Sequence, residues 1–80
     1  MKYVITQTQG IKHVLLCSDI VSHADLAKGH GEVVSAGMVD VYATDGEILV
    51  SVYGKSVTLK TEPRWGDDEL IKKHLTPEVY

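Results

Sequence analysis

The sequence is poor in features that hold many small proteins together. Its 80 residues include a single cysteine, Cys17, which excludes a disulfide within the chain. The four histidines match no standard metal-site spacing, so no metal and no cofactor are expected. Apolar burial in so small a chain only about balances the conformational entropy lost, at about 1.5 kcal/mol per residue. A partner subunit would add the missing stability, and we therefore expect a homo-oligomer.

Long hydrophobic runs and basic runs are also missing. No apolar stretch approaches the roughly 18 residues of a membrane span, and no basic segment precedes an apolar one as in a signal peptide. Eight basic residues face eleven acidic ones, which gives a net charge of −3. General nucleic-acid binding instead needs several lysines or arginines on one face. These observations predict one domain over 1–80, cytoplasmic, with no membrane and no general nucleic-acid partner.

Segments rich in β-branched and aromatic residues are plentiful. Asp45-Gly46 lies between two of them, and this dipeptide is a strong hairpin signal. Gly10 provides the turn of an earlier hairpin. Val57 and Leu59 alternate with polar residues, as in a half-buried strand. The pattern therefore predicts five strands, at 2–7, 11–17, 32–44, 47–53 and 56–60.

Two further segments carry helix signals. Ser22 can cap a short helix of about two turns that ends before Gly29. A second helix is expected from Gly66 to Leu75, with acids in its first turn and lysines in its last. The element order is ββαβββα. We predict an α+β fold, a small antiparallel sheet of about five strands with one or two short helices.

No catalytic motif is complete. Gly54-Lys55-Ser56 resembles the end of a phosphate-binding loop, but Leu49 stands where that motif needs its first glycine. Cys17 closes an apolar strand, which is typical of a buried small hydrophobe rather than a nucleophile. An enzyme is therefore not expected. Lys55 and Ser56 can still contact an anion as single residues.

Other residues have both a ligand-binding and a structural interpretation. Arg64, the only arginine, is next to Trp65, the only tryptophan. Arginine can bind a phosphate and tryptophan can stack on a base, so the pair would suit a nucleotide. The alternative is that Trp65 packs under the final helix. Ser35-Ala36-Gly37 is a run of small residues within a strand, either a bulge or the floor of a ligand site or subunit seam. Gly29-His30-Gly31 either presents amides to an anion or only ends a helix.

Several of these pieces occur in a familiar order. The sequence resembles a group of small uncharacterised accessory proteins encoded by bacteriophages and prophages, and such proteins often counter bacterial defence. The resemblance implies an anti-defence protein in the cytoplasm of the infected host. It is carried by Val14-Leu15-Leu16, His23, residues 33–37, residues 53–59, Pro63-Arg64, and Asp67 or Asp68 before Leu70-Ile71.

We therefore expect a homo-oligomer that sequesters a small anionic ligand of nucleotide type, an immune signal, without catalysis. In this hypothesis Arg64 and Lys55 neutralise phosphate, Ser56 donates a hydrogen bond and Trp65 stacks on a base, with Ser35 and His23 as further candidates. The alternative is an inhibitor that binds and blocks a host defence protein. A nucleotide-degrading enzyme, with His23 or His30 as acid or base, has the least support because no catalytic partner can be named.

Overall fold

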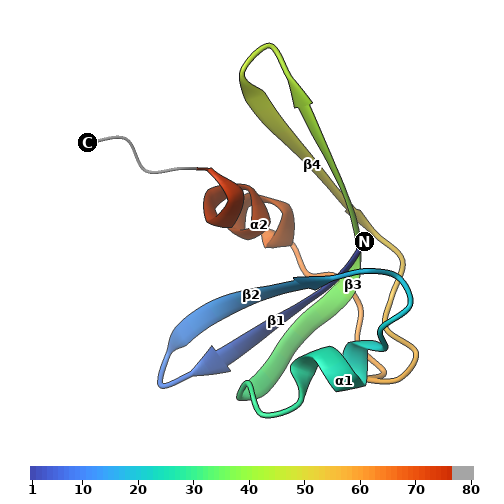
Figure 1. Ribbon diagram of the computed structural model, residues 1–80. Helices are drawn as coiled ribbons and strands as arrows, with labels where there is room; N and C mark the ends of the chain where they lie inside the picture. Colours follow the sequence, from blue (N-terminus) through green and yellow to red (C-terminus); the bar gives the residue numbers. More distant parts are fainter. Residues whose placement is uncertain (77–80) are drawn as a thin grey trace.

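The computed structural model describes residues 1–76, which form an antiparallel sheet and two short helices (Figure 1). The strands lie in the order β2-β1-β3-β4, so β2 and β4 are the edges. The α+β class is confirmed, but the sheet has four strands, not five. Within 1–76 no helix is long and apolar enough to cross a membrane. The elements are β1 (Lys2–Thr8), β2 (Ile11–Cys17), α1 (His23–Ala27), β3 (Glu32–Thr44), β4 (Glu47–Tyr53) and α2 (Asp67–Leu75).

Tight turns set the register of both predicted hairpins. The β1–β2 turn is Gln9-Gly10, with φ of 52° and 80°, and the β3–β4 turn is Asp45-Gly46, with φ of 47° and 79°. Positive φ at both central residues defines the turn type whose twist matches that of the flanking strands. Both hairpins are therefore confirmed at the residues where the sequence predicts them.

The central strand β1 is buried on both faces. Tyr3 and Ile5 point toward α2, while Val4 points toward α1, because successive side chains of a strand alternate between faces. Figure 1 shows the two helices on different sides of the sheet. The α2 side holds the buried cluster Tyr3, Ile5, Val39 and Ile71, and the α1 side holds Val4, Ala27 and Ala36.

The long strand β3 belongs to two different pairings. Its first half, up to Met38, pairs with β1, and its second half, from Met38 onward, pairs with β4. Only the second half and β4 therefore extend past the rest of the sheet. We call residues 39–53 the arm, and Figure 1 shows it rising away from β1 and β2.

The prediction of a strand at 56–60 is wrong, because this segment forms a closed loop. Ser56 and Thr61 exchange two backbone hydrogen bonds, of 2.7 and 3.2 Å, which bring the two ends of the loop together. Lys60 has a φ of 54°, which breaks an extended chain. The two apolar residues whose alternation suggested a strand do not share a covered face. Leu59 packs on the α1 side, whereas Val57 is exposed.

The run of small residues in β3, Ser35-Ala36-Gly37, follows a bulge at Val34 and contains a close crossing of the chain. The pairing of β1 with β3 shifts register between Ile5 and Thr6, opposite Ser35 and Val33. At Gly37 the chain crosses over itself, since a Cβ there would lie 2.7 Å from Pro63 Cγ. The indentation left by Gly37 is thus filled by the chain's own Pro63.

A buried carboxylate attaches α2 to the sheet. The Tyr3 hydroxyl donates a 2.7 Å hydrogen bond to Asp67 Oδ2, and the Arg64 backbone N–H donates to the same oxygen at 2.9 Å. Both Tyr3 and Asp67 are buried. Burial, and then the bond to Asp67, raise the pKa of Tyr3 well above its ordinary value near 10.

This raised pKa predicts a loss of stability in alkali. In the unfolded chain Tyr3 ionises near pH 10, whereas in the folded chain it keeps its proton. Stability contributed by Tyr3 is therefore complete below pH 10 and falls above it, by up to about 1.4 kcal/mol per pH unit. Urea denaturation of a Tyr3→Phe variant should show lower stability at pH 8 but a shallower decline from pH 9.5 to 11. The exposed Tyr42→Phe change is the control, and an unaltered slope in Tyr3→Phe would refute the assignment.

Candidate functional site

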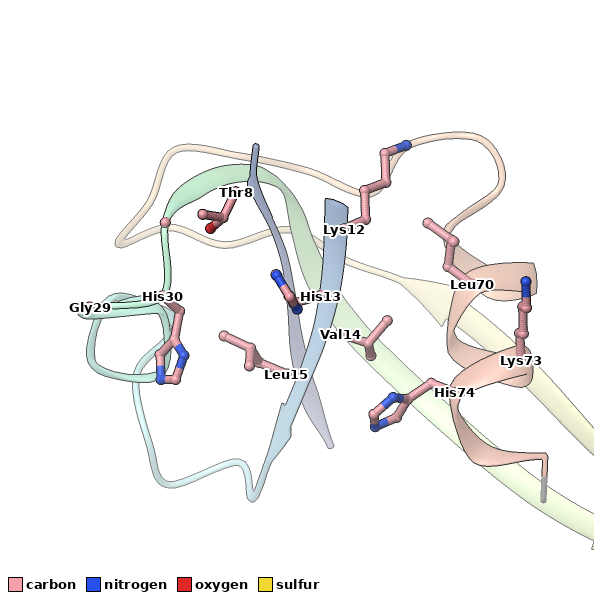
Figure 2. Close-up of a pocket in the computed structure, with 11 residues that line it drawn as sticks. Thr8, Lys12, His13, Val14, Leu15, Gly29, His30, Leu70, Lys73 and His74 are labelled. Carbon is pink, nitrogen blue, oxygen red and sulfur yellow. The ribbon is translucent and has the colours of Figure 1, made fainter. Parts of the chain in front are cut away.

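A concavity of about 760 Å³ opens along the free edge of β2 (Figure 2). Small-molecule sites commonly have volumes of about 300–1,000 Å³. Its walls come from the end of β1, from β2, from the loop between α1 and β3, and from α2. We call this concavity the edge pocket.

The edge pocket is lined by basic side chains. Among the residues of 1–76 that line it, none is an aspartate or a glutamate. This arrangement contrasts with the whole chain, whose net charge is −3. Cations gathered in a concave site raise the local concentration of anions there. The basic residues of the pocket are Lys12, His13, His30, Lys73 and His74.

The basic residues of the edge pocket lie on both sides of β2. Lys12 and His13 are adjacent, so their side chains leave the strand toward opposite faces. In Figure 2, His13 lies on the side of His30, whereas α2 brings Lys73 and His74 to the other side. The edge pocket thus wraps around β2, with basic side chains on both of its sides.

Two glycines position the His30 side of the pocket. Gly29 and Gly31 have φ of 79° and 95°, which favour glycine. A Cβ at Gly31 would overlap Thr8 Oγ1 and lie 3.0 Å from the Gln7 carbonyl oxygen, so the loop crosses β1 at close range. The His30 N–H donates to the Ala27 carbonyl at 3.1 Å. That amide is used to end α1, and the His30 side chain lines the pocket.

Arg64 and Trp65 lie beside a second hollow, of about 270 Å³. This hollow shares Lys12 and Leu70 with the edge pocket, so the two concavities are contiguous. Trp65 is fully exposed, at 102 %, and packing under the final helix is excluded. Asp67 holds this turn from both directions, because its own N–H donates to the Arg64 carbonyl at 3.1 Å.

Lys55 and Ser56 lie elsewhere, in the loop after β4. They line a hollow of about 510 Å³ that does not include Arg64 or Trp65. Lys55 is exposed, but Ser56 is buried and its Oγ accepts a hydrogen bond from the Leu59 N–H at 3.1 Å. The Ser56 hydroxyl therefore helps to close its own loop.

His23 and Ser35 are both interior. The Gly37 carbonyl can only accept, so His23 Nε2 carries the proton and donates to it at 2.7 Å. This bond satisfies β3 at the point where its pairing partner changes from β1 to β4. Ser35 is fully buried, and its Oγ has no hydrogen-bond partner among the described residues.

The fold thus brings Arg64 to Trp65 and Lys55 to Ser56, in two separate places. Ligand binding by the six predicted residues stays a prediction. Sequence reasoning missed the edge pocket, although the basic run at the end of α2 and the lysine in β2 were visible. The missing information is that α2, which packs mainly against β4, also lies beside β2. The residues missed are Lys12, His13, His30, Lys73 and His74.

Metal binding and catalysis by a cysteine nucleophile have little support in the described part of the chain. Within residues 1–76 no group of three or more histidine, cysteine or acidic side chains is placed to hold a metal ion. Burial raises the pKa of the Cys17 thiol, which disfavours the nucleophilic thiolate.

No protein-family model, no curated protein and no solved structure matches this chain. The functional argument is therefore built on the chemistry of the edge pocket and of the adjoining Trp65 hollow.

Proposed function

We propose that this protein binds a small anionic ligand of nucleotide type in the edge pocket and the Trp65 hollow, and holds it without catalysis. The observation that carries this proposal is the lining of the edge pocket. In the described part of the chain its titratable side chains are two lysines and three histidines, with no carboxylate, and the chain has a net charge of −3. Such a lining favours anions over cations and neutral molecules.

The lysines provide the phosphate contacts. Lys12 extends from β2 and Lys73 from α2, so their ammonium groups approach the same concavity from two elements (Figure 2). Hydrogen bonds from an ammonium group to a phosphate oxygen are shorter and stronger than those between neutral groups. Both lysines are exposed and free to move toward a ligand.

Trp65 provides the contact for the rest of the ligand. Indole rings stack on nucleobases, and such stacking contributes about 1–3 kcal/mol per base. Because Lys12 and Leu70 line both hollows, a ligand can place a base on Trp65 and a phosphate in the edge pocket. Arg64, next to Trp65, adds a further cation to the Trp65 hollow.

Binding without turnover agrees with how the histidines of the pocket are placed. A histidine that acts as a general base is normally oriented by a third group, often a carboxylate. Within residues 1–76 no carboxylate lines the edge pocket. A protein with these properties could act by sequestration, and the resemblance to phage accessory proteins suggests a nucleotide immune signal in the cytoplasm of an infected bacterium.

The single tryptophan makes this proposal directly testable. Adenosine 5′-monophosphate should quench Trp65 fluorescence, whereas ribose 5-phosphate should bind, by calorimetry, with little quenching. Replacing the indole by Trp65→Leu should weaken binding of the nucleotide about tenfold or more, since stacking contributes about 1–3 kcal/mol. It should leave the affinity for ribose 5-phosphate unchanged.

These binding measurements distinguish the part of the site that holds the base, at Trp65, from the part that holds the phosphate, in the edge pocket. Loss of affinity for both probes in Trp65→Leu would contradict the separate roles of base and phosphate. Absence of binding for a panel of nucleoside mono- and diphosphates and cyclic nucleotides would overturn the proposal as a whole.

A second candidate function is inhibition of a host defence protein. The free edge of β2 runs through a basic concavity, and an exposed sheet edge can accept an extended strand of a partner. An acidic segment would suit this surface. Recovery of one host protein on the tagged chain, displaced by Lys12→Glu and with no nucleotide retained, would favour this candidate over the first.

A further inference from the structure

The outer edge of β4 has none of the usual protection against pairing. Exposed edge strands commonly carry lysine, proline or a bulge, which discourage another strand from adding to them. β4 has the sequence EILVSVY, and its pairing with β3 contains no register shift. Its one charged residue, Glu47, is at the end of the strand. Within residues 1–76 no strand pairs with this edge.

The other edge of the sheet is different. β2 carries Lys12 and His13, and its free edge opens into the edge pocket. Of the two edges, β4 is therefore the one less protected against pairing with a second copy of itself.

One face of the arm is apolar and only partly covered. Side chains directly opposite each other on paired strands share a face, so Val39, Val41 and Ala43 of β3 share one with Val52, Val50 and Ile48 of β4. Near α2, Val39 is fully buried, but farther out Val41 is 37 % exposed and Ala43 is exposed. Helix α2 thus covers only the nearer part of this apolar face, and the outer part is exposed to solvent.

We propose that β4 pairs antiparallel with β4 of a second copy, about a two-fold axis at Val50. A two-fold interface requires that residue i meets residue j and that j meets i. An axis at Val50 pairs all seven residues of the strand. In this register Val50 meets its own copy, Ile48 meets Val52, Leu49 meets Ser51 and Glu47 meets Tyr53.

Charge and polarity favour a second copy as the occupant. Antiparallel self-pairing places the two Glu47 carboxylates at opposite ends of the new ladder, so no like charges meet. The same register puts Ile48 and Val52 of the two copies on one face, which makes the two apolar faces continuous. Two four-stranded sheets become one of eight strands. The β2 strands then lie at its outer edges, so both edge pockets remain open.

A pair of charge variants tests this interface. Leu49 and Ser51 are exposed, lie on the face away from the apolar one, and would meet each other across the axis. Leu49→Lys with Ser51→Lys places like charges opposite each other, whereas Leu49→Glu with Ser51→Lys places opposite charges together. By sedimentation equilibrium the wild type should have twice the 8.8 kDa chain mass. The first variant should have the single-chain mass, and the second should again have twice that mass.

Each alternative result contradicts the proposal. A wild type that stays monomeric at high micromolar concentration would overturn it, as would a double-lysine variant that still dimerises. Circular dichroism checks that the variants are folded. In a Cys17→Ser background, Val50→Cys should form a disulfide-linked dimer on oxidation, and Thr44→Cys, on the inner strand of the arm, should not. The reverse pattern would place the contact elsewhere.

Discussion

Removing both pocket lysines with Lys12→Ala and Lys73→Ala should weaken binding of adenosine 5′-monophosphate by about 30- to 100-fold. Each ammonium group is expected to contribute a charge-assisted hydrogen bond to the phosphate, and together these should supply about 2–3 kcal/mol. Both side chains are exposed and lie in none of the buried clusters, so their removal should leave the fold intact. Isothermal titration calorimetry measures the change.

The matched control is Lys28→Ala with Lys72→Ala. Both of these lysines are exposed and neither lines the edge pocket or the Trp65 hollow. The control removes the same net charge, and Lys72 lies in the same helix as Lys73, so general electrostatic attraction would weaken equally in both double variants. Equal affinities in the two would show that the anion is attracted by the surface as a whole and would contradict a specific site.

Replacing the buried carboxylate by Asp67→Ala should lower the free energy of unfolding by about 3–6 kcal/mol. The change leaves the Tyr3 hydroxyl and the Arg64 N–H without their acceptor, and hydrogen bonds to charged groups contribute about 1.5–3 kcal/mol each. Small domains have only about 5–15 kcal/mol in total. The same change should loosen the turn that presents Trp65. Urea denaturation measures the stability, and the anisotropy of Trp65 fluorescence measures the mobility of the turn.

Two neighbouring variants separate the causes. Asp67→Asn keeps an acceptor oxygen and should cost less than Asp67→Ala. Asp68→Ala removes a carboxylate from the same first turn of α2 but no described hydrogen bond, so it should cost under about 1 kcal/mol, from the helix dipole alone. If Asp67→Ala were no worse than Asp68→Ala, the attachment of α2 through Tyr3 would be wrong.

Local signals in the sequence were sufficient for most of the fold. The two-residue turns at Gln9-Gly10 and Asp45-Gly46 require glycine, and the Ser22 side chain does accept the Asp25 N–H at 3.1 Å. Such features depend on neighbours along the chain. The strand expected at 56–60 failed because a strand also needs a partner edge, and the loop instead closes on itself through Ser56 and Thr61.

The candidate site was harder to predict for the same reason. Arg64 and Trp65 are adjacent in sequence, and their pairing was visible. Lys12 and Lys73 are brought together only because α2 crosses the sheet next to β2, anchored by Tyr3 and Asp67. Neither lysine has a local pattern that distinguishes it from a solvated surface residue. The hydrogen bond from His23 to the Gly37 carbonyl was equally hidden from the sequence, because it depends on where the pairing of β3 changes from β1 to β4.

The most direct test of the account is to map the ligand on the protein. Amide resonances of the ¹⁵N-labelled chain would be followed during titration with adenosine 5′-monophosphate, which detects binding even at millimolar affinity. The largest shifts should occur at Lys12, His30, Trp65 and Lys73, around the two contiguous hollows. Shifts confined to the loop of Lys55 and Ser56, or no shifts at all, would contradict the claim that the edge pocket is the binding site.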